Sequence, residues 1–242
     1  MGRKGRPRLR RLGAELARLH PELQEPERLV ADGCIAVDGR VVTNPASLVR
    51  AGASIVVRRA RPLRGEAKLR GALAAFDVAV RGRVALDAGA AAGGFTRVLL
   101  EAGARRVYAV DAGHGQLLGS LRQDRRVVNL ESVNLGDLTR RQVPDPVELV
   151  TMDLSYLAIA RAASQLELLD LADGADLVAL VKPMFELAVA RPPDDAAEVR
   201  AAVERAESGL AAAGWEPRGA IESPVRGSRG AVEWLVHARR RQ

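Results

Sequence analysis

Apolar positions in the first 60 residues follow a helical period and then change to short strand-like runs. Within residues 8–30 leucines recur at the spacing of short helices, at Leu9, Leu12, Leu16 and Leu19. Pro26 begins a second helix at a position that tolerates proline, and Gly33 ends it. Asp38-Gly39 separates two β-branched runs, which is a strong hairpin signal, and residues 54–57 add a strand. The pattern predicts a compact module of about 60 residues.

After residue 80 the pattern changes to buried-type strands that alternate with amphipathic helices. We expect strands at 84–87, 106–111, 127–130, 149–153 and 177–181, and helices at 94–102, 116–122, 157–169 and 195–213. Two last strands, 215–222 and 232–238, follow with no helix between them. The alternation predicts an α/β fold with a mostly parallel sheet and helices on both faces. The final pair predicts an antiparallel hairpin at one edge.

Composition narrows the class of protein. The 242 residues are 48% hydrophobic and 28% charged, which is enough for a packed core and excludes wholesale disorder. No apolar run approaches the roughly 18 residues of a membrane helix, and no apolar segment follows the basic N-terminus. Cys34 is the single cysteine and the three histidines are scattered, which argues against a disulfide framework or a metal site. We expect a cytoplasmic protein without a membrane partner.

Positive charge is concentrated near the N-terminus. Residues 1–70 hold 16 Lys and Arg against 7 Asp and Glu, a net charge of +9, whereas the whole chain carries +7. Residues 71–242 therefore carry −2. This asymmetry indicates a polyanionic partner, usually nucleic acid, and a solvated basic face is the alternative.

Lysine is rare in this chain. Only Lys4, Lys68 and Lys182 occur among 37 basic residues, so the sequence uses arginine almost wherever charge alone is needed. A desolvated lysine can lose its proton whereas arginine cannot. Lys68 and Lys182 are therefore candidates for proton chemistry, with chance as the alternative.

A glycine-rich stretch leaves the first strand of the α/β region and enters its first helix. Residues 87–96 read Asp-Ala-Gly-Ala-Ala-Ala-Gly-Gly-Phe-Thr, and the candidate cofactor-binding residues are Asp87, Gly89, Gly93, Gly94, Phe95 and Thr96. The spacing differs from that of dinucleotide-binding and phosphate-binding loops. Ligands of open α/β sheets bind at the carboxyl ends of strands, where glycines let the backbone come close. A tight structural turn without a ligand is the alternative.

Acidic residues flank this loop. Asp111 ends the second strand, where a carboxylate can accept both ribose hydroxyls of an adenosine, and Asp87 would place negative charge near a ligand amino group. This arrangement suits S-adenosylmethionine, a cationic nucleoside, better than a pyrophosphate. Asn134, in the loop after the third strand, is a candidate for contacting the adenine.

Four further polar residues are expected at the ligand edge of the sheet. Asp153 and Lys182 end the fourth and fifth strands, Glu233 lies in the last strand, and Lys68 opens the helix that leads into the sheet. Strand ends converge on one crevice, and a buried lysine must be paired or neutral. A satisfied structural ion-pair network is the alternative for this set.

Together these stretches resemble the FtsJ-like ribose 2′-O-methyltransferases, and within them the ribosomal RNA methyltransferases of the TlyA family, some labelled haemolysin A. The matching stretches are 64–69, 87–96, 111–117, 153–155 and 180–186. The resemblance implies an S4-like RNA-binding domain of α+β type at 1–60, a linker at 61–67, and a methyltransferase domain at 68–242. The second domain would have a Rossmann-like, seven-stranded, mostly parallel sheet with an antiparallel last strand.

The resemblance also implies a mechanism. The family's catalytic tetrad corresponds to Lys68, Asp153, Lys182 and Glu233. Lys182 would be the general base, Asp153 would orient it near the transferred methyl, and Glu233 would hold Lys68. S-adenosylmethionine would be the cofactor and structured RNA, ribosomal RNA or a ribosomal subunit, the partner.

Three segments depart from the family pattern: 19–23, 187–193 and 228–231. They keep open a non-catalytic RNA-binding or ribosome-associated protein on a degenerate methyltransferase scaffold. A methyltransferase for a small molecule or a protein, with the basic module incidental, is a further alternative.

Overall fold

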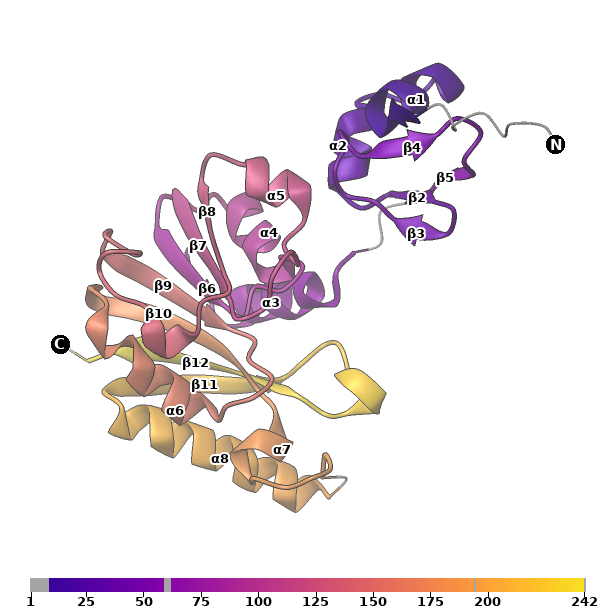
Figure 1. Ribbon diagram of the computed structural model, residues 1–242. Helices are drawn as coiled ribbons and strands as arrows, with labels where there is room; N and C mark the ends of the chain where they lie inside the picture. The colour runs from indigo at the N-terminus through magenta and orange to yellow at the C-terminus, as the bar shows by residue number, and fades with distance from the viewer. Residues whose placement is uncertain (1–8, 59–61, 194, 242) are drawn as a thin grey trace. The chain divides into compact units, whose positions relative to one another are not determined.

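The computed structural model describes residues 9–58, 62–193 and 195–241. Residues 1–8 and 59–61, within the predicted RNA-binding module and linker, lie outside the described residues, as do residues 194 and 242. The contacts divide the chain into two units (Figure 1): Met1–Arg61 with Leu118–Asp124, and Pro62–Leu117 with Arg125–Gln242. None of the described helices is long and apolar enough to cross a membrane.

The first unit combines short helices with short antiparallel strands. Its elements are β1 (Leu9–Arg11), α1 (Leu12–Leu19), α2 (Pro26–Ala31), β2 (Ile35–Val37), β3 (Arg40–Val41), β4 (Leu48–Arg50), β5 (Ile55–Val57) and α5 (Gly119–Gln123). Strands β3, β2 and β5 form one sheet, and β1 pairs with β4. The core beneath them contains Leu12, Leu16, Val30, Ile35 and Val49.

Local signals placed most of these elements. Helix α2 begins at Pro26, and Gly33 follows it with φ of +71°. Asp38 and Gly39 both have positive φ, as a two-residue hairpin of the type I′ class requires. The helical prediction for Leu9 is wrong, because residues 9–11 pair with β4, and a partner about 40 residues away leaves no local signal.

The second unit contains a seven-stranded sheet in the order β11-β12-β10-β9-β6-β7-β8 (Figure 1). The strands are β6 (Val84–Ala88), β7 (Arg106–Asp111), β8 (Val127–Glu131), β9 (Val147–Met152), β10 (Leu171–Val181), β11 (Trp215–Glu222) and β12 (Trp234–Arg240). Six strands run in the same direction, and β12 runs antiparallel to both of its neighbours, β10 and β11. The predicted fold class is confirmed.

Helices cover both faces of this sheet. They are α3 (Arg64–Ala75), α4 (Gly94–Glu101), α6 (Ile159–Ser164), α7 (Pro183–Glu186) and α8 (Ala196–Ala212), with 3-10 turns η1 (Leu135–Asp137), η2 (Gln165–Leu168) and η3 (Ser228–Gly230). Helices α3 and α4 pack together on one face, and α6 and α8 pack together on the other (Figure 1). The core is built mainly from Val, Leu and Ala, with the fully buried Trp215 among its largest side chains.

Several boundaries differ from the sequence prediction. Helix α3 begins at Arg64, inside the expected linker 61–67, because the Glu66 side chain accepts a hydrogen bond from the Leu63 amide and caps the first turn. The helix expected at 157–169 divides into α6 and η2, and the short helix α7 was not anticipated. Asp195 caps α8 by accepting from the Ala197 amide, as the acidic start of that helix predicted.

Candidate active site

The parallel strands of the second unit bring three predicted residues to one edge of the sheet. Ala88 at the end of β6 pairs with Val110 of β7 and with Met152 of β9. Gly89, Asp111 and Asp153 each follow one of these paired residues. All three therefore lie at the carboxyl edge, where ligands of open α/β sheets bind.

A cavity of about 240 Å³ opens at this edge, and Gly89, Asp111 and Asp153 all line it. The rest of its lining includes the apolar side chains of Val133, Leu135 and Leu154 and the polar side chains of Gln116, Ser155 and Tyr156. The lining thus combines apolar side chains with the carboxylates of Asp111 and Asp153. A ligand with a flat apolar ring and hydroxyl groups matches that division.

Gly89 is where two strand ends come closest. It has φ of +84°, and a β-carbon at this position would lie 2.5 Å from the Asp153 carbonyl oxygen. Only glycine fits, because any side chain would separate the two strand ends that form the base of the cavity. The Asp153 amide also donates to the Ala88 carbonyl at 3.0 Å, which holds these backbones together.

Asp111 connects the loops on both sides of the cavity. Its Oδ2 accepts from the Ala91 amide at 2.9 Å, and its Oδ1 accepts from the Gly113 amide at 2.7 Å. A carboxylate has about four acceptor positions, so two remain for a ligand. Asp111 can therefore hold the loops and accept ribose hydroxyls together.

Asp87 lies beneath the glycine loop and is completely buried. Thr96 and Thr151 donate hydroxyl hydrogen bonds to its two oxygens at 2.6 and 3.0 Å. Burial raises the pKa of Asp87 to about 6, although the threonine hydrogen bonds act against the rise. Asp87 and Thr96 fix the start of α4 from below, and direct contact with a cofactor stays a prediction for both.

The remaining loop residues also support the cavity from behind. Gly93 precedes α4 with φ of +95°. A β-carbon on Gly94 would lie 3.1 Å from the Gly65 α-carbon, so this glycine permits the close packing of α4 on α3, and Phe95 is buried beside it. Asn134 is exposed and donates to Asp137, while its neighbours Val133 and Leu135 line the cavity. Cofactor contacts of these residues stay predictions.

The four tetrad residues form two ion pairs. The Lys68 ammonium lies 2.6 Å from Glu233 Oε2, and both side chains are only 7% exposed. The Lys182 ammonium lies 2.7 Å from Asp153 Oδ1 and donates to the Ser155 hydroxyl at 2.7 Å. Asp153 and Ser155 line the cavity, so Lys182 lies at its margin.

Strand register places both pairs at the same end of the sheet. Val181 of β10 pairs with Trp234 of β12, Lys182 follows the first, and Glu233 precedes the second. Glu233 packs against the loop between β11 and β12. The Ser223 amide, at the start of this loop, donates a hydrogen bond to the Glu233 carbonyl. A β-carbon on Gly227 would lie 2.3 Å from Glu233 Oε1, so a side chain at this position would displace the Glu233 carboxylate.

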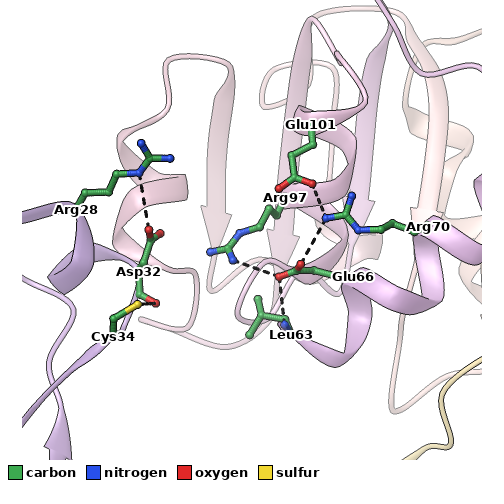
Figure 2. A network of polar contacts seen from close by, with 8 residues as sticks. All are labelled: Arg28, Asp32, Cys34, Leu63, Glu66, Arg70, Arg97 and Glu101. Atoms are coloured by element: carbon green, nitrogen blue, oxygen red, sulfur yellow. Dashed lines mark hydrogen bonds and ion pairs between the residues drawn. The ribbon is translucent and has the colours of Figure 1, made fainter. Parts of the chain in front are cut away.

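Helix α3, which carries Lys68, is held to α4 by a polar network (Figure 2). Buried Glu66 accepts hydrogen bonds from Arg97 at 3.2 Å and from the Leu63 amide at 3.1 Å. Arg70 joins Glu66 to Glu101. This network fixes α3 beside the glycine loop, and so restricts where the Lys68 ammonium can lie.

Glu131 is a site residue that the sequence analysis missed. Its carboxylate accepts from the consecutive amides of Gly115, Gln116 and Leu117 at 3.0, 2.8 and 2.9 Å. Burial alone would raise its pKa, but these hydrogen bonds lower the pKa of Glu131 to about 2. The signal was available, because Glu131 ends β8 directly beside Asp111 in the register. Glu131 therefore shapes the loop that places Gln116 in the lining of the cavity. Helix α5 begins only after this loop, at Gly119.

Metal ligands do not gather at this edge. In the part of the chain that the structure describes, no group of three or more His, Cys, Asp or Glu side chains could hold a metal ion.

The chain is similar in sequence and in fold to proteins that are already known. Residues 62–240 match the model of the FtsJ-like methyltransferase family. A 16S/23S rRNA (cytidine-2′-O)-methyltransferase TlyA of Mycobacterium tuberculosis is 40% identical to this chain, in an alignment that covers 95% of this chain and 89% of that protein. Hemolysin A of Brachyspira hyodysenteriae is 32% identical, in an alignment that covers 86% of this chain and 90% of that protein. A solved structure of a candidate hemolysin from Streptococcus thermophilus, 27% identical, covers 98% of this chain and 90% of its own with a TM-score of 0.71.

Proposed function

Since the chain belongs to the FtsJ-like methyltransferase family, we propose that it transfers a methyl group from S-adenosylmethionine to a ribose 2′-hydroxyl of ribosomal RNA. The observation that carries this proposal is the Lys182–Asp153 ion pair at the margin of a strand-end cavity that also holds Asp111. The family resemblance seen in the sequence is confirmed by the match over residues 62–240.

The lining of the cavity fits the proposed cofactor. Asp111 retains acceptor positions for two ribose hydroxyls, and Val133, Leu135 and Leu154 offer apolar contact to an adenine ring. The Asp153 carboxylate adds negative charge suited to a cation. S-adenosylmethionine, when bound, supplies an electrophilic methyl group on its sulfonium.

Lys182 and its two partners would manage the proton of the substrate hydroxyl. That oxygen must give up its proton as it accepts the methyl group, and a positioned side chain assists such a step. Asp153 and Ser155 hold the Lys182 nitrogen from two directions, which fixes the third position of that nitrogen for a substrate oxygen. As a neutral amine, Lys182 would direct its two N–H groups to Asp153 and Ser155 and accept the hydroxyl proton on its lone pair. Asp153 would balance the charge of the ammonium that results.

Lys68 and Glu233 would position the site. Their buried pair lies at the same end of β10 and β12 as Lys182. Its net charge is zero, so the fold can bury it without an unpaired ion. The pair would add an oriented dipole beside the reacting groups and hold α3 against the sheet.

The first unit would bind the RNA. Residues 1–61 hold 13 Lys and Arg against 6 Asp and Glu, a net charge of +7, and Arg18, Arg28, Arg40 and Arg50 are exposed among the described residues. Arginine is suited to phosphate and RNA recognition. The assignment of residues 1–60 as an S4-like domain, next to a methyltransferase domain from residue 68, belongs to this proposal.

The direct test uses the full chain, labelled S-adenosylmethionine and ribosomal subunits. Lys182→Ala should reduce methyl transfer at least about a thousandfold, within the range for removal of a general base, while calorimetry shows cofactor binding as in the unaltered chain. Arg161→Gln, at an exposed position of α6, is the matched control and should transfer at the normal rate. Full activity of Lys182→Ala would refute the role. No heat with S-adenosylmethionine from the unaltered chain would favour the degenerate scaffold.

The substrate is tested in cells. Mass spectrometry of ribosomal RNA from cells with and without the protein should show one or more ribose methyl groups that depend on it. If the ribose methyl pattern is the same, while the pure enzyme methylates a small molecule or a protein, the RNA assignment is wrong.

A further inference from the structure

A second, larger cavity of about 630 Å³ lies in the second unit, away from the site described above. The charged and aromatic residues of its lining are Phe76, Asp77, Arg83, Asp176, Arg218, His237 and Arg239. Asp176 precedes Lys182 by six residues on β10, which is about 20 Å at 3.3 Å per residue. This arginine cavity therefore lies toward the opposite end of the sheet from the tetrad.

The base of the arginine cavity is a buried and satisfied ionic cluster. Asp176 is 9% exposed, and its oxygens meet Arg83 Nη1 at 2.6 Å and His237 Nε2 at 2.8 Å. Burial would raise the pKa of Asp176, but the hydrogen bonds with His237 and Arg83 lower it. Phe76 stacks on the His237 ring with 5.5 Å between centroids. The ion pair with Arg83 thus neutralises the charge of buried Asp176, and these contacts fix the shape of the base of the cavity.

Two other arginines are held so that their charge faces the cavity. Arg239 donates its Nε to the Gly174 carbonyl at 3.0 Å, so a neutral group orients the guanidinium and leaves its charge uncompensated by that contact. Arg218 is the extra residue of a bulge in β11, where Pro217 and Gly219 pair with adjacent residues of β12. A bulge redirects a side chain, and here it brings Arg218 to the cavity that His237 lines.

Nearby acidic side chains compete only weakly with a ligand for the guanidinium groups of Arg218 and Arg239. Arg218 pairs with Glu216 at 2.9 Å, but both side chains are about half exposed, and such surface pairs contribute little. Asp77, the other acid lining the cavity, is exposed. Two guanidinium groups above a neutralised base form a site for a tetrahedral oxyanion, because the arginine fork matches phosphate oxygens.

We propose that the arginine cavity binds a backbone phosphate of the RNA substrate, with Arg218 and Arg239 as its ligands. This inference rests on the proposed function for the identity of the RNA. It assigns the second unit an RNA contact of its own, about 20 Å along the sheet from the methyl-transfer site. The contact orients structured RNA on the methyltransferase unit and does not act on the reacting atoms.

The test compares a double variant, in which Arg218→Gln and Arg239→Gln are combined, with a charge-matched double control. The control combines Arg161→Gln and Arg200→Gln, whose side chains are exposed on helices α6 and α8. Binding of ribosomal RNA to the full chain is measured at several salt concentrations. The cavity variant should bind about tenfold more weakly, and its slope of log affinity against log salt should be smaller by about 1 to 2. The control should stay within about twofold of the unaltered chain. Equal affinities and slopes in all three, or equal losses in both variants, would overturn the proposal.

A charge-retaining variant and a small probe complete the design. Arg218→Lys with Arg239→Lys should recover the salt slope but only part of the affinity, because lysine keeps the charge and loses the fork. Titration with inorganic phosphate should shift the NMR signals of the Arg218 and Arg239 side chains. Shifts of this kind together with unchanged RNA binding in the Gln variant would mean a site for free phosphate, and would overturn the RNA proposal.

Methylation separates this inference from the proposed function. The Gln variant should show a raised KM for RNA with unchanged kcat, since neither arginine lies at the tetrad. If the unaltered chain methylates no RNA, the proposed function fails. The salt-dependent binding measurement still decides the cavity in that case.

Discussion

Replacing Asp87 with asparagine removes a carboxylate that the fold buries completely beneath the glycine loop. Its pKa rises from 3.8 to about 6, chiefly because of burial. The difference of about 2 units corresponds to roughly 3 kcal/mol of destabilisation when the group is ionised at pH 7. The folded state holds a proton between pH 4 and 6 that the unfolded state has released. The stability of the unaltered chain therefore falls as the pH rises through this window.

The variant should lose this pH dependence. Asparagine keeps one acceptor oxygen for Thr96 or Thr151, and the other hydroxyl must turn to accept from the amide, which costs about 1 kcal/mol. We expect Asp87→Asn to be about 1 to 2 kcal/mol more stable than the unaltered chain at pH 7. At pH 4, where Asp87 is protonated in the fold, the advantage should vanish or reverse.

Urea unfolding of both proteins at pH 4 to 8 measures the difference. Asp173→Asn, at an exposed position, is the control and should follow the unaltered chain throughout. A stability difference between Asp87→Asn and the unaltered chain that stays constant from pH 4 to 7 would refute the reasoning. Calorimetry with S-adenosylmethionine provides a second test. Because Asp87 is buried beneath the loop whereas Asp111 lines the cavity, Asp87→Asn should weaken cofactor binding less than Asp111→Asn does.

Three further changes test the supporting contacts. Glu131→Gln should weaken S-adenosylmethionine binding about tenfold in calorimetry, since three loop amides lose a charged acceptor. In the unaltered chain, the stability that Glu131 contributes should be present above pH 4.5 and lost as the pH falls toward 2. Gly227→Ala should reduce methyl transfer about tenfold or more at unchanged cofactor affinity, because its β-carbon would displace the Glu233 carboxylate. Lys68→Met alone should lower the urea midpoint more than Lys68→Met with Glu233→Met, because the single change leaves a buried charge unpaired; equal midpoints would contradict a buried pair.

The mostly parallel sheet and the carboxyl-edge location of the site were predictable because both follow from the alternation of strands and helices along the chain. Short, largely apolar runs such as Val84–Ala88 alternate with helices, and the rule for parallel sheets then places strand-end residues together. The pairing of β1 with β4 was not predictable in this way. Its two strands of three residues lie about 40 residues apart, and each is too short to show a period.

The glycine loop shows where sequence reasoning stops. Its pattern indicates that the backbone approaches something closely, but not which neighbour it approaches. The structure separates two cases: Gly89 lies against the Asp153 backbone at the cavity, whereas Gly94 lies against Gly65 between two helices. A ligand loop and a helix contact thus share one run of glycines, and only the positions of the neighbours distinguish them.

The tetrad illustrates the complementary case, in which position along a strand is enough. Composition drew attention to Lys68 and Lys182 because this chain otherwise uses arginine for charge. Their partners could be named because Asp153 and Glu233 occupy strand ends, although Lys68 and Glu233 are 165 residues apart in the sequence. The two pairs are electrically neutral, which allows four ionisable groups to share one end of a buried sheet. Residues with a chemical role were thus predictable from strand position, whereas Gly227, which leaves room for the Glu233 carboxylate at that end, required the coordinates.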